Sequence, residues 1–221
     1  MNPPPPTLPK SLVDALERVS FPTIGHFLES GFVSPEIKTM TPGLTFVGRA
    51  VTARIPSPDG VLLHRVMAQA APGDVVVIDT GCDRTHAVVG AVIATAAQVA
   101  GAAGIVVDGV VTDILDLRAM AIPVFARGTS VLTAKQIGID DGGINVPVVC
   151  GGVTVHPGDV VMADENGVLV LDPHVAAGVV DQAVASDEAE PELLRQLRSG
   201  RSLPDLSKAN EILARMGYPA S

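Results

Sequence analysis

Two polar segments hold most of the residue types in this sequence that could do chemistry. Residues 79–86, Asp-Thr-Gly-Cys-Asp-Arg-Thr-His, and residues 108–113, Asp-Gly-Val-Val-Thr-Asp, each follow a β-branched run that is typical of a buried strand. Ligands of parallel α/β sheets bind beyond the carboxyl ends of the strands, so both segments are candidate sites. The carboxylates of Asp108 and Asp113 are ligands that hard divalent cations prefer. The first segment leads into an apolar stretch whose helix N-terminus could hold a carboxylate.

Four more side chains in or near these segments are candidates for a direct role. Arg84 could bind an anionic substrate, and His86 could transfer protons because the reference pKa of imidazole lies near neutrality. Cys82 could act as a nucleophile, but the spacing shows no base that would activate it. Arg118 lies about one helical turn beyond Asp113 and could reach the same pocket. Each residue also has a structural alternative, such as a solvated charge, a salt bridge or a capping histidine, and the sequence leaves both open.

Apolar periodicity and turn residues predict alternating strands and helices around the two segments. We expect helices over residues 11–19, 60–70, 87–100, 114–120 and 173–199, and strands over 46–53, 75–78, 105–107, 123–126, 146–149, 153–155, 160–163 and 168–171. The central β–α–β–α–β order predicts parallel strands with right-handed crossovers. Asn166-Gly167 predicts a hairpin. The segment 87–100 is apolar nearly all round, so we expect that helix to be buried on several sides.

Composition limits the class of protein. Hydrophobic residues make up 47% of the 221 residues but aromatic residues only 3%, so small aliphatic side chains must fill a closely packed core. With only 18% charged residues to cover the surface, we expect buried subunit interfaces. The net charge of −9 disfavours nucleic-acid binding, and we find no transmembrane stretch. Two distant cysteines and an N-terminus unlike a signal peptide predict a cytoplasmic protein.

Several motifs, taken as a set, resemble the RraA-like family, which includes the HMG/CHA aldolases. Residues 108–113 resemble the family's D-G-x-x-R-D motif, Gly90-Ala91-Val92-Ile93 resembles its G-[D/E]-x-L segment, and residues 123–128 match P-V-F-A-x-G. Residues 145–159 resemble N-V-P-V-x-x-G-G-x-x-V-x-P-G-D, and residues 164–168 resemble D-x-x-G-V. The resemblance covers residues 20–205, so it concerns most of the chain.

The resemblance implies an α/β fold of the RraA-like α/β/β/α swivelling type, with a mainly parallel sheet plus short antiparallel strands. This domain would span residues 9–199, between a disordered or extended arm over residues 1–8 and a C-terminal tail over residues 200–221. A homotrimer or homohexamer with active sites between subunits is also implied. Aldolase members cleave 4-hydroxy-4-methyl-2-oxoglutarate or related acids to pyruvate and decarboxylate oxaloacetate. They use a divalent metal such as Mg²⁺ or Mn²⁺ that polarises the 2-oxo acid.

The resemblance also assigns roles to residues. Asp113 takes the position of the metal ligand, and the segment Gly90, Ala91, Val92 and Ile93 takes the position whose amides hold a substrate carboxylate, with Asp108 and Arg118 nearby. Thr112, however, stands where the family has an arginine, and Ala91 where it has an acidic residue that orients metal-bound water. Threonine cannot form a bidentate clamp on a carboxylate. At about 1.5–3 kcal/mol per charged hydrogen bond, both changes should weaken binding of metal and 2-oxo acid.

Three functions are open at this point. The first is a carbon–carbon lyase that uses Asp113 on a small oxo or hydroxy acid, with Glu188 or Glu190 near the position of a family glutamate that reaches a neighbour's site. The second is a non-catalytic regulator, because RraA-like regulators bind RNase E and an acidic trimer could engage a basic protein segment. The third is a metal-independent enzyme that uses His86 or Arg84. We favour an enzyme, because residues 79–86 are richer in reactive groups than a scaffold needs.

Overall fold

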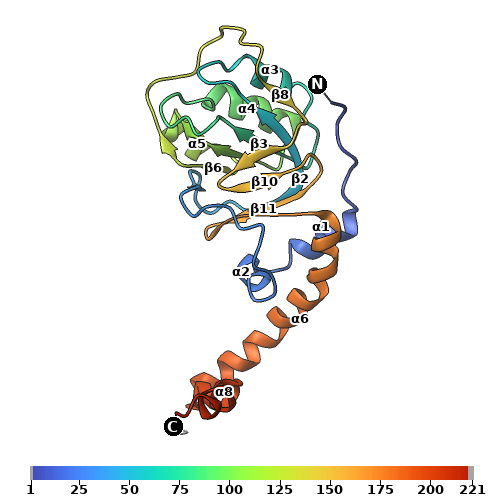
Figure 1. Cartoon of the computed structure of the whole chain (residues 1–221), viewed down its shortest axis with the longest axis vertical. Coiled ribbons are helices and arrows are strands. Elements are labelled where there is room, and N and C mark those ends of the chain that lie inside the picture. The colour runs from blue at the N-terminus through green and yellow to red at the C-terminus, as the bar shows by residue number, and fades with distance from the viewer. Residues whose placement is uncertain (1, 219–221) are drawn as a thin grey trace.

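A mixed β-sheet forms the centre of the molecule (Figure 1). The structure is a computed structural model and describes residues 2–218. Along the sheet the strands follow the order β1 (Lys38–Thr39), β6 (Val124–Ala126), β4 (Gly104–Asp108), β3 (Asp74–Asp79), β2 (Phe46–Arg54), β11 (Val160–Asp164) and β12 (Gly167–Leu171), and β8 (Gly143–Ile144) also pairs with β2. The first and last strands of this order, β1 and β12, approach each other, so the sheet is nearly closed.

Within this sheet, parallel pairing is confined to four neighbouring strands. Strands β2, β3, β4 and β6 run parallel, in a register that places Asp79 beside Asp108 at the carboxyl ends of β3 and β4. Strands β1, β8, β11 and β12 add only antiparallel pairs, and the predicted hairpin at Asn166-Gly167 joins β11 to β12. The prediction of a mainly parallel sheet is therefore confirmed for the centre, but the sheet as a whole is mixed. The apolar pattern located the longer strands of this sheet but not the two-residue strands β1 and β8. It also did not identify the partner of each strand, and the partner sets the direction.

Three short helices, α3 (Val61–Met67), α4 (Ala91–Ala100) and α5 (Ile114–Ala119), pack on one face of this sheet. The other face is covered by the antiparallel pair β9 (Val148–Cys150) and β10 (Val153–Val155), which packs on β3. A small parallel pair, β5 (Val110–Val111) and β7 (Gly128–Thr129), lies beyond the ends of β4 and β6. The predicted elements recur at these positions, and the α3–α4–α5 layer is the one that borders residues 108–113.

Close packing of small residues, which the composition predicted, is visible where β4 passes Phe46. A Cβ atom on Gly104 would lie 2.4 Å from the Phe46 ring, so only glycine allows the strand and the ring to approach this closely. The Phe46 ring in turn packs edge to face against Phe125, with ring centroids 5.7 Å apart. Two of the few aromatic side chains, Phe46 and Phe125, are thus buried in the core, where glycine and valine surround them.

Helix α4 differs from its prediction in two respects. It begins at Ala91 rather than Ala87, because residues 87 and 89 form isolated β-bridges with Thr133 and Val111. It is also not buried on several sides in the single chain. Ala94 and Ala97 are fully buried, but Val92 is 76% exposed and Val99 is 83% exposed. A helix made almost entirely of Ala, Val and Ile has no polar face that would show which side meets the sheet.

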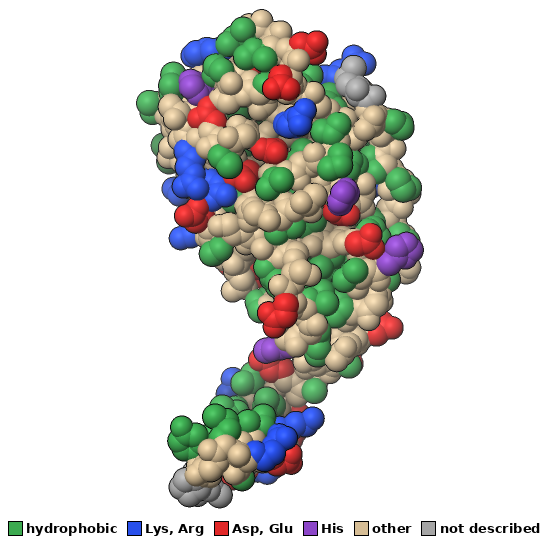
Figure 2. Space-filling model, viewed as in Figure 1, with side chains coloured by type: hydrophobic (Ala, Val, Ile, Leu, Met, Phe, Trp, Pro, Cys, Tyr) green, Lys and Arg blue, Asp and Glu red, His purple; other side chains and the backbone are tan. Residues whose placement is uncertain are grey.

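The last described helices lie at the end of the molecule opposite α3 and α4 (Figure 1). Helix α6 (Pro173–Arg198) begins at Asp172, whose carboxylate accepts a hydrogen bond from the His174 N–H at 2.7 Å. Its first half packs with α1 (Lys10–Leu16) and α2 (Phe21–Ile24) on β11 and β12, and its second half leaves the body (Figure 1). The expected polar tail contains two further helices, α7 (Leu203–Leu206) and α8 (Ala209–Arg215). Figure 2 shows hydrophobic side chains gathered on this protruding end.

The proline-rich N-terminal arm is extended and lies against the domain. The Asn2 N–H donates to the Ile144 carbonyl, and the Asn2 side chain donates to the Asn145 carbonyl at 2.9 Å. Farther along, Arg49 donates to the Pro5 carbonyl at 2.6 Å while it holds the buried Asp74. Among residues 2–218, no helix is long and apolar enough to cross a membrane.

Candidate functional site

In the polar loop after β3, most of the charged side chains form hydrogen bonds or ion pairs with other residues of the chain. The Asp83 carboxylate accepts from the Ser57 hydroxyl, from the Thr85 N–H at 2.6 Å and from the His86 N–H at 3.2 Å, and it lies 2.7 Å from His86 Nδ1. Burial alone would raise the pKa of Asp83, but the bonds from Ser57, Thr85 and His86 hold this pKa well below its ordinary value. Asp83 is therefore a charged organiser of the loop, and it orients His86.

Two other predicted candidates of this loop, Asp79 and Arg84, are also bound by residues of the chain itself. The Asp79 carboxylate accepts from the Gly81 N–H at 2.8 Å and from the Val149 N–H at 3.1 Å, so it joins the loop to β9. Arg84 donates to the Glu36 carboxylate at 2.9 Å, with both side chains more than half exposed. Cys82 is exposed and has a positive φ of 65°. These contacts are those of a folded surface loop.

Asp108 and Arg118 bind other parts of the chain and do not line a pocket with Asp113. The Asp108 side chain is buried, forms an ion pair with Arg127 and accepts a hydrogen bond from the Gly151 N–H at 2.7 Å. Hydrogen bonding to Asp108 raises the pKa of Arg127 further above its ordinary value. Asp108 thus fastens the end of β4 to the β9–β10 turn. Arg118 is exposed and donates to the Met40 carbonyl at 3.3 Å.

Asp113 directly precedes α5 in the chain, but its carboxylate lies at the N-terminus of the neighbouring helix α4. It takes the left-handed backbone conformation, with φ of 55°, and its Oδ2 accepts a hydrogen bond from the Ala91 N–H at 2.9 Å. The Thr112 hydroxyl lies 3.3 Å from the other oxygen, Oδ1. A Cβ atom on Gly90 would lie 2.4 Å from Asp113 Oδ2, so the approach of this carboxylate requires glycine there. The first N–H group of α4 is thus satisfied by this carboxylate instead of by a capping side chain of the helix itself.

Asp113 lines a pocket of about 200 Å³. Of the residues predicted for the site, the structure brings together Thr112, Asp113, Gly90, Val92 and Ile93 in its walls, and Ala91 contributes its N–H to Asp113. The described residues that line this pocket do not include the other predicted residues, namely Arg84, His86, Asp108 and Arg118. Glu188 and Glu190 are exposed on the distal half of α6, which points away from the end of the molecule that holds α4 (Figure 1).

Four polar residues that line the pocket with Asp113 are not among those predicted from the sequence, namely His64, Thr133, Lys135 and Gln136. The His64 Nε2 and Gln136 Nε2 atoms are 3.4 Å apart. These residues come from α3 and from a loop far along the chain, so neither spacing nor a local motif joined them to Asp113.

A buried aspartate fixes the loop that carries Lys135. The Asp59 carboxylate accepts hydrogen bonds from the N–H groups of Val61, Ile137, Gly138 and Ile139, at 2.6–3.1 Å. Burial acts to raise the pKa of Asp59, but these four donors lower it on balance. Pro58-Asp59-Gly60 is a typical turn sequence, and it was the one available signal that the chain is held tightly here.

The donor set at Asp113 fits one kind of metal ion. Among residues 2–218 of a single chain, no three His, Cys, Asp or Glu side chains are grouped so that they could hold an ion. The pocket offers one carboxylate and the Thr112 hydroxyl. Mg²⁺ keeps several waters and commonly takes only one or two protein carboxylates together with substrate oxygens. The residues present therefore fit a hydrated Mg²⁺-type ion and do not fit a site that encloses the metal with protein ligands.

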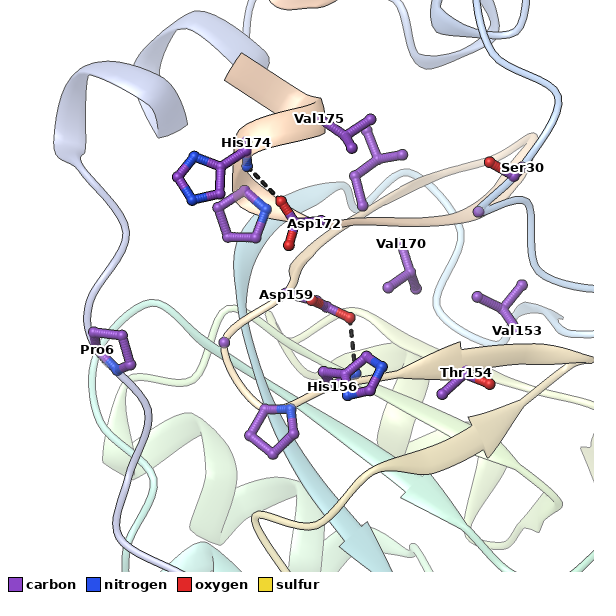
Figure 3. Close-up of a pocket in the computed structure, with 15 residues that line it drawn as sticks. Pro6, Ser30, Val153, Thr154, His156, Asp159, Val170, Asp172, His174 and Val175 are labelled. Atoms are coloured by element: carbon purple, nitrogen blue, oxygen red, sulfur yellow. Dashed lines mark hydrogen bonds between the residues drawn. The ribbon is translucent and has the colours of Figure 1, made fainter. Parts of the chain in front are cut away.

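A larger cavity, of about 570 Å³, lies on the other side of the domain, where β10, β12 and the start of α6 meet (Figure 3). Its polar groups include the carboxylates of Asp159 and Asp172, which accept hydrogen bonds from the N–H groups of His156 and His174. Burial raises the pKa of Asp159. The described residues that line this cavity include no lysine or arginine, so an anionic substrate would meet two carboxylates there. Volume alone is therefore a poor guide to a site for acids.

Comparison with known proteins agrees with the motifs. The RraA-like family model, described as Aldolase/RraA, matches residues 11–170. A relative from Halalkalibacterium halodurans, provisionally named a 4-hydroxy-4-methyl-2-oxoglutarate aldolase, is 40% identical over 156 residues, which are 69% of this chain and 73% of the relative. The solved structure of the RNA-processing inhibitor RraA from Thermus thermophilis matches with a TM-score of 0.63 and 30% identity, over 69% of this chain and 92% of that one. Streptomyces coelicolor RraAS2, an unusual member of the RNase ES inhibitor RraA family, matches with a TM-score of 0.72 and 28% identity, over 87% and 99%.

Proposed function

Because this chain belongs to the RraA-like (Aldolase/RraA) family, we propose that it is a carbon–carbon lyase that decarboxylates or cleaves a small 2-oxo acid in the Asp113 pocket. The observation that carries this proposal is the state of the Asp113 carboxylate. It accepts one backbone N–H, from the first residue of α4, and among residues 2–218 its Oδ1 has only the Thr112 hydroxyl within hydrogen-bond distance. An accessible carboxylate oxygen with spare acceptor capacity, fixed on a rigid element inside a pocket, is suited to bind an ion or a substrate group.

The reaction requires stabilisation of negative charge on a carbonyl oxygen. In decarboxylation of oxaloacetate the bond between C3 and the C4 carboxylate breaks, carbon dioxide leaves, and the electron pair moves through C3 to the C2 carbonyl oxygen. A proton added at C3 then gives pyruvate. A Mg²⁺ or Mn²⁺ ion held by Asp113 would act as a Lewis acid on the 2-oxo group. The chain's own residues hold and orient the reactants: Asp113 supplies the negative charge, and Val92 and Ile93 form apolar walls of the pocket on the α4 side.

Thr112 shapes which acids this pocket can take. Its hydroxyl replaces a charged, bidentate group with a neutral donor or acceptor. A neutral hydroxyl there suits a substrate with a neutral group where the family's substrates have a carboxylate. For a substrate that keeps the carboxylate, we expect Thr112 to bind it more weakly than a guanidinium would.

We also propose that the chain works as a homotrimer or homohexamer. The supporting observation is the exposed apolar face of α4, where Val92 and Val99 are 76% and 83% exposed beside the pocket. Leu115 on α5 is 77% exposed and adds to the apolar surface of this layer. Light scattering after gel filtration should give three or six times the mass of one chain. Val99→Glu should shift that mass toward the monomer, whereas a monomeric wild type would contradict the assembly.

Turnover of defined substrates tests the proposed function. Purified protein is stripped with a chelator, dialysed, and given oxaloacetate or 4-hydroxy-4-methyl-2-oxoglutarate with and without Mg²⁺ or Mn²⁺, and pyruvate is followed with lactate dehydrogenase. We expect metal-dependent pyruvate formation above the rate of metal ions alone. No turnover of either acid with either metal, by a correctly assembled protein, would contradict the lyase.

A second candidate function is a protein-binding regulator. It is favoured by Thr112 and Ala91, which replace the family's charged residues, and by the likeness to the Thermus RNA-processing inhibitor. The net charge of −9 would favour a basic partner segment. Binding of the intact protein to a basic, arginine-rich RNA-binding segment of RNase E should then be measurable and should weaken as salt rises. Saturable, salt-sensitive binding without turnover would favour the regulator over the lyase.

A further inference from the structure

Lys135 is the one lysine or arginine among the described residues that line the Asp113 pocket. No carboxylate of residues 2–218 lies within 4.0 Å of its ammonium group, whereas several arginines of the same domain form ion pairs. Arg84 and Arg127, for example, both bind Glu36. The pocket thus contains one negative and one positive side chain, Asp113 and Lys135, that do not neutralise each other.

Backbone hydrogen bonds hold the segment of Lys135 to two other segments of the chain, residues 58–60 and residue 87. Its N–H donates to the Pro58 carbonyl at 2.7 Å, and its carbonyl accepts from the Gly60 N–H at 2.8 Å. One residue earlier, the Ala134 N–H donates to the Ala87 carbonyl at 2.9 Å, in the segment that leads to α4. The backbone of Lys135 is therefore held in place between the residues that precede α3 and those that precede α4. Only its flexible side chain is free to adjust to a ligand.

We propose that Lys135 binds the carboxylate of the substrate, in the role that Thr112 cannot fill. This inference rests on the proposed function and specifies its substrate class: an acid whose carboxylate meets the ammonium of Lys135 while its oxo group faces Asp113. A 2-oxo acid carries these two groups on adjacent carbons, and the cavity between Lys135 and Asp113 is of the size of such a small molecule. The ammonium is a point charge with three donors, so it binds a carboxylate oxygen without the fixed fork of a guanidinium.

Binding of pyruvate, with oxaloacetate turnover as a second readout, tests the role of Lys135. The dissociation constant of pyruvate is measured by ligand-detected NMR on the intact protein with and without Mg²⁺, for the wild type, Lys135→Met, Lys135→Arg and the double variant Thr112→Arg/Lys135→Met. Lys208→Met, an exposed lysine at the start of α8 far from the pocket, is the matched control. Thermal unfolding of each variant shows whether the fold is kept.

Loss of one charged hydrogen bond to the carboxylate should weaken pyruvate binding about tenfold to a hundredfold in Lys135→Met. Lys135→Arg and Lys208→Met should stay within a few-fold of the wild type, and Thr112→Arg should restore binding in the double variant. KM for oxaloacetate should rise in Lys135→Met more than kcat falls.

Two results would overturn the inference, and they differ. If the wild type turns over oxaloacetate and Lys135→Met binds pyruvate normally, the role of Lys135 is wrong and the lyase remains. If neither the wild type nor Thr112→Arg binds pyruvate or turns over oxaloacetate, the proposed function fails and the inference falls with it.

Discussion

The two polar loops at the carboxyl ends of β3 and β4 contain similar residue types, but they differ in how many hydrogen bonds their carboxylates already accept. In the loop of residues 79–86, Asp79, Asp83 and Arg84 are all engaged with partners from the chain itself. In the loop of residues 108–113, Asp113 accepts one backbone hydrogen bond and faces a pocket. A carboxylate already surrounded by donors has little capacity left for a ligand, and removing those donors would be costly. The number of reactive residues in a loop therefore says less about function than the hydrogen-bonding capacity that remains.

The largest effect should come from the charge of Asp113. Asp113→Asn keeps the size of the side chain and an oxygen for the Ala91 N–H, but it removes the negative charge from the pocket. We expect kcat/KM for oxaloacetate to fall at least about a hundredfold, as when one preorganised electrostatic group is removed. Asp116→Asn, which changes an exposed carboxylate on α5 three residues later, is the matched control and should keep its activity. Equal activity of the two variants would remove the functional difference between the two loops.

A gain should follow if the missing positive charge is supplied at Thr112. Thr112→Arg places a planar, permanently charged group beside Asp113, where it could clamp a substrate carboxylate with two hydrogen bonds. We expect KM for oxaloacetate to fall about tenfold, for one added charged interaction of about 1.4 kcal/mol. Steady-state kinetics at fixed Mg²⁺ measure this change. A higher KM would mean that the guanidinium pairs with Asp113 instead, and that this pocket is not arranged for acids.

A moderate effect on stability, but not on substrate binding, should come from Asp83. Asp83→Asn replaces a charged acceptor of several hydrogen bonds with a neutral group, which should cost about 1–3 kcal/mol of unfolding free energy. The folded-state pKa of Asp83 is lowered, so its stabilising contribution is present above its ordinary value of 3.8 and is lost as the pH falls below it. Urea unfolding between pH 3 and pH 7 should show a smaller acid-induced loss of stability in Asp83→Asn than in the wild type. KM for oxaloacetate should stay within about twofold, since Asp83 is not among the described residues that line the Asp113 pocket.

Local signals in the sequence were sufficient for most of the fold. β-branched runs bounded by Gly and Pro located β3, β4 and β11, and Asn166-Gly167 located the hairpin, because these preferences act within a few residues. The start of α4 could not be found in this way. Residues 87–90 are as apolar as the helix itself, and they stay extended only because they pair with Val111 and Thr133. The boundary matters, because it places Gly90 and the Ala91 N–H against Asp113.

The candidate site was predictable only in the part carried by one motif. Asp113 and Thr112 were identified because they adjoin a strand end and match a family motif. Lys135 could not be identified, because its place depends on backbone hydrogen bonds to Pro58 and Gly60 far along the chain. Asp108, by contrast, was predicted as a site residue but has a structural role. Its position after β4 made it a candidate ligand, but Arg127 and the Gly151 N–H, both from other elements, engage its carboxylate.

The smallest effect should come from Arg84, and it is the most direct test of the metal-independent alternative. Arg84 forms an exposed ion pair with Glu36 and is not among the residues that line the Asp113 pocket, so Arg84→Ala should change the unfolding free energy by less than about 0.5 kcal/mol. Oxaloacetate turnover should be unchanged and should remain sensitive to chelator. If Arg84→Ala or His86→Ala instead abolishes turnover while Asp113→Asn keeps it, the loop of residues 79–86 contains the site. The hydrogen bonds of that loop would then have to rearrange when the substrate binds.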